Sequence, residues 1–259
     1  MGVVNVTPDS FSDGGAFDEP ADAVAHGRRL AAEGAGILDV GGESTRPGAA
    51  PVPAEEELRR VLPVVEGLAR SARVSIDTMK LRVAEAALDA GASYVNDVTA
   101  FRHDPDLAGL VADRGAGCCL MHMLGEPRTM QRDPRYGDVV SEVKAFLAAR
   151  LAFAVAAGVP ETHIQLDPGI GFGKTLEHNL ELLRRLDELT DLGRPIVIGT
   201  SRKSFLGRIT GRDVAERVPA TIATCVMALE RGARVFRVHD VAEVADALKV
   251  TAATLRSDG

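Results

Sequence analysis

Short apolar runs alternate with longer segments of helical hydrophobic spacing along the whole chain, and this alternation constrains the fold more than any other feature. Eight runs have the length and composition of strands. They lie at 2–6, 36–40, 73–76, 94–98, 117–121, 163–166, 195–198 and 235–238. Helical spacing is found at 21–33, 54–69, 80–90, 105–114, 138–157, 177–188, 215–231 and 241–255.

Eight strand–helix units in 259 residues are typical of a (β/α)₈ TIM barrel, which commonly fills this length. We therefore expect one α/β barrel domain over residues 1–259, with its site at the C-terminal ends of the strands. A doubly wound sheet is the alternative. Glycine follows several of the expected helices and is favoured there as a left-handed C-cap, at Gly34, Gly91, Gly115, Gly158 and Gly232.

Bulk composition excludes several classes of protein. The net charge is −7 and no basic tail stands out, so a nucleic-acid partner is not expected. No apolar run reaches membrane-spanning length, and no signal peptide is recognised. The three cysteines are too few and wrongly spaced for a disulfide framework or a zinc knuckle. We expect buried thiols at Cys118 and Cys119, and a cytoplasmic location.

Chemically active residues follow the expected strands, whereas mainly Gly, Ala, Pro and Val precede them. In a barrel, the loops after the strands meet at one end and carry the chemistry. Here those loops contain residues 5–15, 41–48, 77–78, 96–97, 121–123, 167–174, 199–204 and 237–240. This asymmetry predicts one active site at that end.

The loop 39–48, DVGGESTRPG, combines glycines, hydroxyls and an arginine. Such a loop suits an anion, because backbone amides approach closely and the Arg46 guanidinium matches phosphate; an ordinary turn is the alternative. We expect a cationic, anion-binding cluster of Ser44, Thr45, Arg46, Arg237 and His239. Asn5 is a candidate oxygen ligand for Mg²⁺.

Three oxygen acceptors, Asp77, Asn96 and Asp167, end three different strands. Together they would satisfy a ligand with a donor-rich edge, such as an aminopyrimidine ring. Lys203 is placed to meet a carbonyl or ring nitrogen of that ligand, and Met121 and Phe172 are candidate apolar walls. The alternative for a strand-end aspartate is a helix N-cap, and for Arg237 and His239 a surface pair.

Other motifs fit less well. The run Gly171–Thr175 resembles a P-loop, but Pro168 stands where that motif requires glycine. The run Gly199–Lys203 resembles a nucleophile elbow, but Lys203 occupies a required glycine position. No histidine spacing matches a zinc site. Ser-His-Asp catalysis stays open, because its partners meet only in space.

The chain resembles the dihydropteroate synthase family along nearly its whole length. The resemblance is carried by MGVVNVTPDSFSDGG at 1–15, DVGGESTRPGA at 39–49, SIDTMK at 75–80, VNDV at 95–98, LMHM at 120–123, LDPGIGFGKTLEHNL at 166–180, GTSRKSF at 199–205 and RVHDV at 237–241. Members of that family usually carry a short additional N-terminal segment.

The resemblance implies condensation of 6-hydroxymethyl-7,8-dihydropterin diphosphate with 4-aminobenzoate, assisted by Mg²⁺, in folate biosynthesis. It implies a dissociative mechanism, closure of the loops 6–15 and 44–50, competition by sulfonamides, and a homodimer. The implied catalytic residues are Asp77, Asp167, Lys203 and Arg46. The implied pterin site is Asp77, Asn96, Asp167, Lys203, Met121 and Phe172. Diphosphate is expected at Thr45, Arg46, Arg237 and His239, with the metal at Asn5, and 4-aminobenzoate at Thr45, Pro47, Phe11 and Ser204.

Three rival functions remain open from the sequence. A pterin-dependent methyltransferase shares the acceptor trio but needs no diphosphate cradle, so Arg46, Arg237 and His239 disfavour it. A non-catalytic pterin-binding paralogue is disfavoured because every motif position is filled. A phosphate-binding barrel with another substrate does not account for the full set of loops. The segment 125–137 is expected to be a lid or rim.

Overall fold

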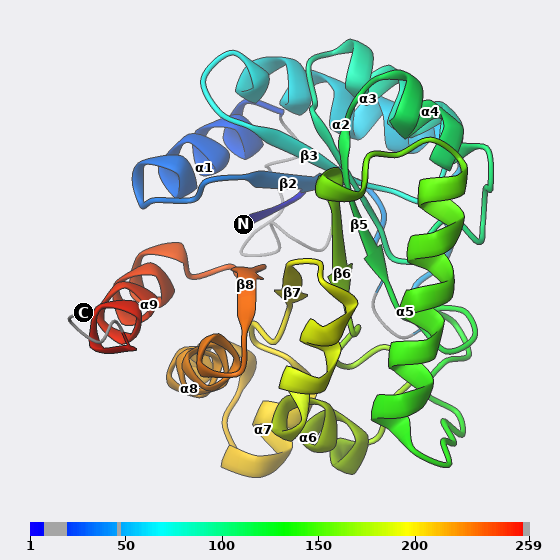
Figure 1. Ribbon diagram of the computed structural model, residues 1–259. Coiled ribbons are helices and arrows are strands. Elements are labelled where there is room, and N and C mark those ends of the chain that lie inside the picture. The colour runs from blue at the N-terminus through cyan, green and yellow to red at the C-terminus, as the bar shows by residue number, and fades with distance from the viewer. Residues whose placement is uncertain (8–19, 46–47, 256–259) are drawn as a thin grey trace.

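The chain forms a closed parallel barrel in the computed structural model, which describes residues 1–7, 20–45 and 48–255. Within these residues eight strands run in sequence order, with helices outside them (Figure 1). The strands are β1 Gly2–Asn5, β2 Leu38–Gly41, β3 Val74–Asp77, β4 Tyr94–Asp97, β5 Gly117–Met121, β6 Ile164–Asp167, β7 Ile196–Ile198 and β8 Ala233–Phe236. Val238, just after β8, bridges to Gly2, and the Val3 amide donates to the Val238 carbonyl at 3.0 Å. This closure confirms the TIM barrel and excludes the doubly wound sheet.

The expected helices are all present, with ends shifted by a few residues. They are α1 Pro20–Ala32, α2 Ala54–Ala69, α3 Leu81–Asp89, α4 Leu107–Asp113, α5 Val139–Ala156, α6 Leu176–Arg184, α8 Val218–Glu230 and α9 Val241–Leu255. The short helix α7, Ser204–Thr210, was not predicted, nor were the 3₁₀ turns at Glu161–His163, Leu186–Leu192 and Val214–Glu216. All five glycines expected as C-caps have positive φ, between 60° and 106°.

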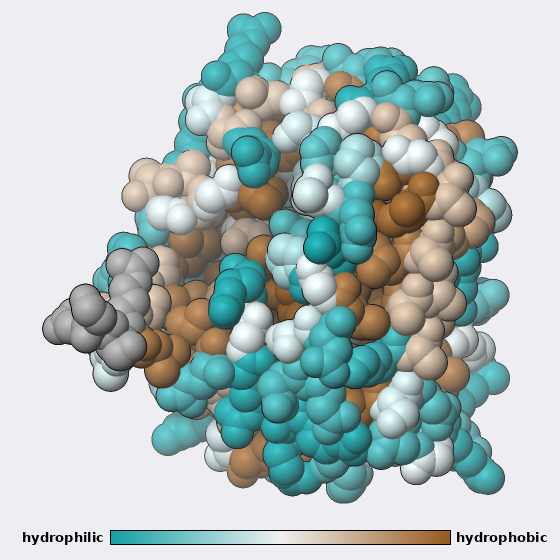
Figure 2. Space-filling model, in the orientation of Figure 1, coloured by the Kyte–Doolittle hydropathy of each residue, from teal (hydrophilic) through white to brown (hydrophobic). Residues whose placement is uncertain are grey.

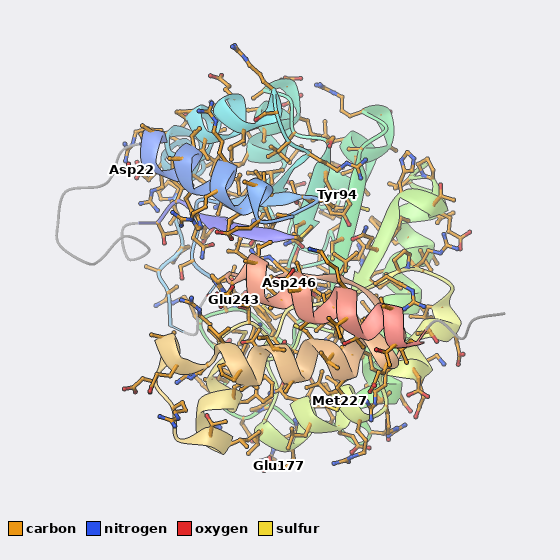
Figure 3. All side chains as sticks on the ribbon, turned by 90° about the vertical axis from the view of Figure 1, so that its left-hand side faces the viewer. Asp22, Tyr94, Glu177, Met227, Glu243 and Asp246 are labelled. Atoms are coloured by element: carbon orange, nitrogen blue, oxygen red, sulfur yellow. The ribbon has the colours of Figure 1, made fainter. Side chains whose placement is uncertain are left out.

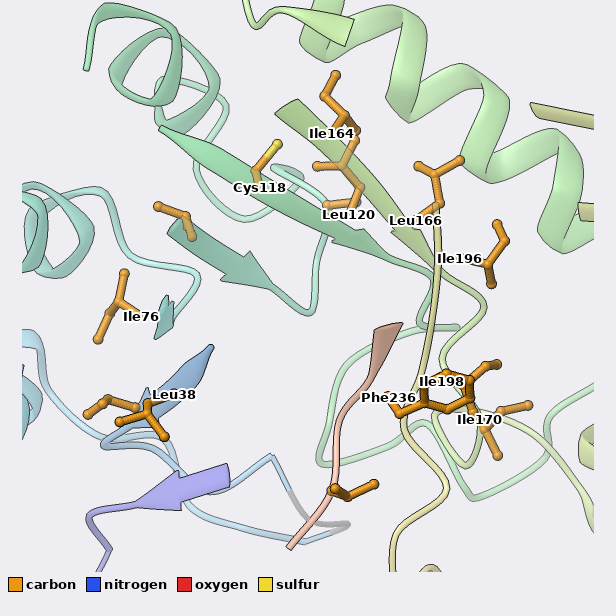
Figure 4. Close-up of a cluster of buried hydrophobic side chains, with 14 of the residues drawn as sticks. Leu38, Ile76, Cys118, Leu120, Ile164, Leu166, Ile170, Ile196, Ile198 and Phe236 are labelled. Carbon is orange, nitrogen blue, oxygen red and sulfur yellow. The ribbon is translucent and has the colours of Figure 1, made fainter. Parts of the chain in front are cut away.

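The main hydrophobic core lies between the strands and the helices. Side chains alternate across a strand, so Leu38, Ile76, Leu120, Leu166 and Ile198 point outward and are fully buried (Figure 4). Burial of each such side chain contributes about 1.5–3 kcal/mol. The expected buried thiols are confirmed, since Cys118 and Cys119 are buried and free.

The inside of the barrel has a smaller apolar layer, formed by Tyr94, Cys119 and Val197 with Met1 and Val235 against it. This layer fills the lower barrel, so polar side chains further along the strands lie above it.

The outer surface also carries apolar side chains. Figure 2 shows them along α5, where Phe146, Leu151 and Phe153 are half-buried against the core. No helix in the described ranges has both the length and the apolar character needed to cross a membrane.

Candidate active site

A polar layer lies inside the barrel, centred on Asp39. This carboxylate is 0% exposed and accepts hydrogen bonds from Ser75 Oγ at 2.5 Å and Asn96 Nδ2 at 2.9 Å. Arg237 Nε donates to it at 2.6 Å. Because Asn96 donates through its nitrogen, its side-chain oxygen remains an acceptor. Four strands or strand ends therefore meet at one buried charge.

Asp77 lies next to this layer. Its backbone is in register with Gly41 of β2 and Asn96 of β4, and Arg237 Nη2 donates to its Oδ2 at 2.7 Å. Burial raises the pKa of Asp77 to about 7; Arg237 opposes the rise, and the Asp39 charge adds to it. Arg237, which the sequence assigned to the diphosphate, thus links the two carboxylates. It is not a surface pair with His239.

Asp167 lies at the end of β6, beside Met121 of β5 in the strand register. It is 6% exposed, and its Oδ1 accepts from the Gly169 amide at 2.7 Å. Burial raises the pKa of this carboxyl, and the amide bond opposes the rise. Hydrogen-bond donors of a ligand would replace the hydrogen bonds to water that Asp167 has lost on burial.

Lys203 precedes α7 and donates from Nζ to the Ile170 carbonyl. The same nitrogen lies 4.1 Å from the centroid of the Phe172 ring, a cation–π contact. Burial lowers the pKa of Lys203 to about 8, and the charges of Asp167 and Asp77 act in the opposite direction. Asp77 and Asp167 end β3 and β6, and Lys203 follows β7, so the three side chains share one end of the barrel.

Phe172 packs against an apolar cluster of Val98, Met121, Met123 and Met130. Met121 and Phe172, the two candidate walls, therefore lie in one apolar cluster. This wall stands beside Asp167 and Lys203, so a flat ring would meet apolar atoms on one side and acceptors at its edge.

Three further predicted residues, Thr45, Ser204 and His239, lie in or directly after the connections that follow β2, β7 and β8. His239 Nδ1 is 2.9 Å from Ser201 Oγ, and the His239 amide donates to the same oxygen at 3.1 Å. Thr45 is half-buried, and Ser204 is exposed at the first residue of α7. Phe11, Arg46 and Pro47 lie outside the described residues.

The described residues offer few ligands for the expected Mg²⁺. No cluster of three or more His, Cys, Asp or Glu suited to a metal ion occurs in the part of the chain that the structure describes. Asn5 ends β1 and is half-buried, and its side chain makes no hydrogen bond to the described residues. The Asn5 oxygen fits a metal ion that takes its other ligands from a bound anion and from water.

Sequence reasoning missed two groups near the site. Asp39 was quoted only as the start of a motif, although a charged residue within the apolar run 37–40 indicates a paired, buried charge. Lys174 and His122 were also missed: both are buried, and Lys174 Nζ lies 2.9 Å from His122 Nδ1. No spacing rule connects these two residues.

A separate cavity of about 360 Å³ lies between α1 and α2. Its lining contains none of the candidate site residues; it consists of Arg28, Ala31, Leu38, Gly67, Leu68, Arg70, Ser71 and Ala72. The chemistry therefore gathers at the strand ends rather than there.

The model of the family described as pterin binding enzymes matches residues 1–239. The chain belongs to this pterin-binding family. This membership agrees with an apolar wall bordered by the acceptors Asp77, Asn96 and Asp167, and it confirms the resemblance drawn from the motifs.

Individual pterin-binding relatives match over almost the whole chain. Dihydropteroate synthase of Escherichia coli K12 is 46% identical over 257 residues, which cover 98% of this chain and 91% of the relative. The structure of the Xanthomonas albilineans dihydropteroate synthase with 4-aminobenzoic acid has a TM-score of 0.93 at 49% identity, covering 99% of this chain and 93% of that one. The Yersinia pestis enzyme in a sulfonamide complex has a TM-score of 0.93 at 43% identity, with coverages of 98% and 93%.

Proposed function

We propose that this protein is a dihydropteroate synthase, a transferase of folate biosynthesis. It joins 6-hydroxymethyl-7,8-dihydropterin diphosphate to 4-aminobenzoate and releases diphosphate. The observation that carries the proposal is the gathering of Asp77, Asn96, Asp167 and Lys203 at one barrel end beside the Met121–Phe172 wall. Relatives of the same name match the full chain at more than 40% identity.

The pterin ring lies against Met121 and Phe172. Its ring NH and amino groups donate to Asp77, Asp167 and the free oxygen of Asn96, and Lys203 meets its carbonyl or ring nitrogen. Buried carboxylates with raised pKa values are costly when ionised without partners. Two donors on the ring offset that cost, which makes the site selective for a donor-rich heterocycle.

The diphosphate extends towards Thr45, Arg46, Arg237 and His239. Arg237 donates to Asp39 and Asp77 through Nε and one Nη, and a guanidinium has five N–H donors, so others remain for a phosphate oxygen. Mg²⁺ would be held by Asn5 together with diphosphate oxygens, and it would supply charge neutralisation for the leaving group.

The reaction proceeds by loss of diphosphate before attack. The C–O bond to the exocyclic methylene breaks and its electron pair leaves with diphosphate. Asp77 and Asp167 stabilise the resulting cation electrostatically. The 4-aminobenzoate nitrogen then forms the C–N bond and releases one proton to solvent. An aromatic amine is unprotonated near neutral pH, so the chain needs no strong general base.

The second substrate lies at the rim. Thr45, Pro47, Phe11 and Ser204 are the residues we assign to 4-aminobenzoate, and the loops 6–15 and 44–50 close over it and exclude water. Sulfonamides compete there by imitating its shape and charge. The support is the 4-aminobenzoic acid and sulfonamide complexes of the two structural relatives.

Diphosphate release separates this function from its rivals. The purified chain with Mg²⁺ is given both substrates, then each one alone, and inorganic diphosphate and dihydropteroate are quantified. A synthase releases diphosphate and forms dihydropteroate in a 1:1 ratio only when both substrates are present. Stoichiometric pterin binding without release would instead identify a non-catalytic paralogue. Methyl transfer from methyltetrahydrofolate would identify a methyltransferase.

We also propose that the chain is a cytoplasmic homodimer that forms a single domain over 1–259. Helices α8 and α9 lie side by side on one outer face (Figure 3). On α9, Val250 is 67% exposed and Leu255 is 52% exposed, and apolar surface of this kind favours association. Light scattering that gives the mass of one chain at micromolar concentration would contradict the dimer.

A further inference from the structure

The connection between β6 and α6, residues 168–175, determines where two pterin-contacting groups lie. It carries Phe172 and supplies the Ile170 carbonyl that accepts from Lys203 Nζ. The Lys203 ammonium is thus held by this connection on two sides, the carbonyl and the Phe172 ring. Any displacement of the connection moves both the wall and the cation.

A second segment, residues 122–138 between β5 and α5, holds that connection from outside. Tyr136 Oη donates to the Gly173 carbonyl at 2.8 Å, and Gln131 Nε2 donates to the Gly171 carbonyl. The fit is close. A Cβ at Gly169 would lie 1.9 Å from the His122 carbonyl oxygen, and one at Gly173 would lie 2.7 Å from Leu124 Cβ. The two segments therefore interlock.

Lys174 joins them from within. Only 3% of it is exposed, and Nζ lies 2.9 Å from His122 Nδ1 and 3.0 Å from the Phe172 carbonyl oxygen. Within the described ranges it forms no ion pair with a carboxylate. Burial lowers the pKa of His122 to about 3, with further lowering by Lys174 and Arg102, so His122 is neutral and its Nδ1 accepts from Lys174 Nζ.

Lys174 Nζ is buried against two neutral acceptors, and this burial lowers the pKa of Lys174 well below its ordinary value. An apolar side chain of the same length would avoid the desolvation cost. The position of Lys174 has a consequence that an apolar residue would lack, because Nζ fixes the carbonyl of Phe172, the residue whose ring forms the pterin wall.

We propose that Lys174 and Tyr136 are positioning residues for the pterin, acting through Phe172 and Lys203 without touching the substrate. This inference rests on the proposed function and assigns a role to the segment 122–138, which supports the pterin wall. Part of this segment, residues 125–137, was expected to be a lid or rim. Removal of either bond lets the connection shift and weakens pterin binding, while the 4-aminobenzoate site is not directly affected.

The test compares Lys174→Met with the parental chain. Methionine keeps most of the side-chain volume and removes the amino group. We expect the Kd for 6-hydroxymethylpterin, by calorimetry, and the KM for pterin diphosphate to rise about fivefold to tenfold, as for loss of one buried hydrogen bond. The KM for 4-aminobenzoate at saturating pterin diphosphate should stay within about twofold of the parental value. A fold defect alone would lower the active fraction and kcat while leaving both KM values unchanged.

Two further variants complete the design. Lys144→Met is the matched control, because Lys144 lies on α5 and pairs with Asp191 away from the connection, and we expect parental constants. Tyr136→Phe removes one hydroxyl and keeps the ring, so it tests the inference even if Lys174→Met does not fold. We expect about threefold weaker pterin binding, in line with one neutral hydrogen bond.

If the parental chain is active and Tyr136→Phe binds pterin with parental affinity, the inference is wrong and the proposed function still stands. The same result is required of Lys174→Met if that variant folds. A parental chain that neither binds pterin nor releases diphosphate would overturn the proposed function as well. The two failures are therefore distinguished by the parental measurement.

Discussion

The substitution Asp77→Asn should stabilise the fold while it abolishes activity. Asp77 is 11% exposed at its side chain, and its pKa in the folded protein is about 7, against 3.8 for an ordinary aspartate. The pKa of Asp77 is higher in the folded protein than in the unfolded protein, so the folded state suffers no penalty below the unfolded-state pKa. The free energy of unfolding then falls as the pH rises through about 7 and Asp77 ionises. Ionised Asp77 therefore costs at most about 4 kcal/mol above that pH. Asparagine avoids the charge and still offers Arg237 an oxygen.

The assay is urea unfolding at pH 5 and pH 8, for the parental chain and the variant. The variant's advantage in the free energy of unfolding should grow by about 2.5 kcal/mol between these two pH values. Asp246→Asn is the control, because Asp246 is 78% exposed on α9 (Figure 3) and its replacement should give no pH-dependent difference. A variant that is less stable at pH 8, or whose advantage does not change with pH, would refute the assignment of a costly carboxylate at the site.

Three other outcomes are expected. Lys203→Ala should keep the fold, measured by circular dichroism, and lower kcat/KM for pterin diphosphate at least about a hundredfold; parental turnover would contradict its assignment. The pH profile of kcat/KM should rise through about 7 as Asp77 ionises and fall through about 8 as Lys203 loses its proton, so a flat profile from pH 6 to 9 would count against this pair. Diphosphate with Mg²⁺ should tighten 4-aminobenzoate binding in calorimetry, whereas equal affinity without diphosphate would exclude loop ordering by the anion.

The barrel was predictable because its signals are local and repeated. Each strand is a short apolar run, and helices such as α2 and α3 have a clear apolar period. The C-cap glycines mark helix ends through a backbone conformation that few other residues adopt. By contrast, the seven-residue helix α7 at Ser204–Thr210 buries only the adjacent residues Phe205 and Leu206, so its sequence has no helical period to recognise.

The candidate site was predictable in part. Strand-end residues such as Asp77, Asn96 and Asp167 share one end of any parallel barrel, so their proximity follows from topology. The hydrogen-bond and ion-pair partners of these residues do not follow from topology. The pairing of Arg237 with Asp39 and Asp77 joins residues up to 198 positions apart, and the burial of Lys174 against His122 depends on how two loops pack. Such contacts are set by three-dimensional closure, which no spacing in the sequence records.

We propose that one end of the barrel binds the pterin ring and its diphosphate together. A crystal structure with 6-hydroxymethyl-7,8-dihydropterin diphosphate and Mg²⁺ tests it most directly. We expect the ring between Phe172 and the acceptors Asp77 and Asp167, with the diphosphate beside Arg237. A pterin bound elsewhere, for instance in the cavity between α1 and α2, with the strand ends vacant, would contradict the account.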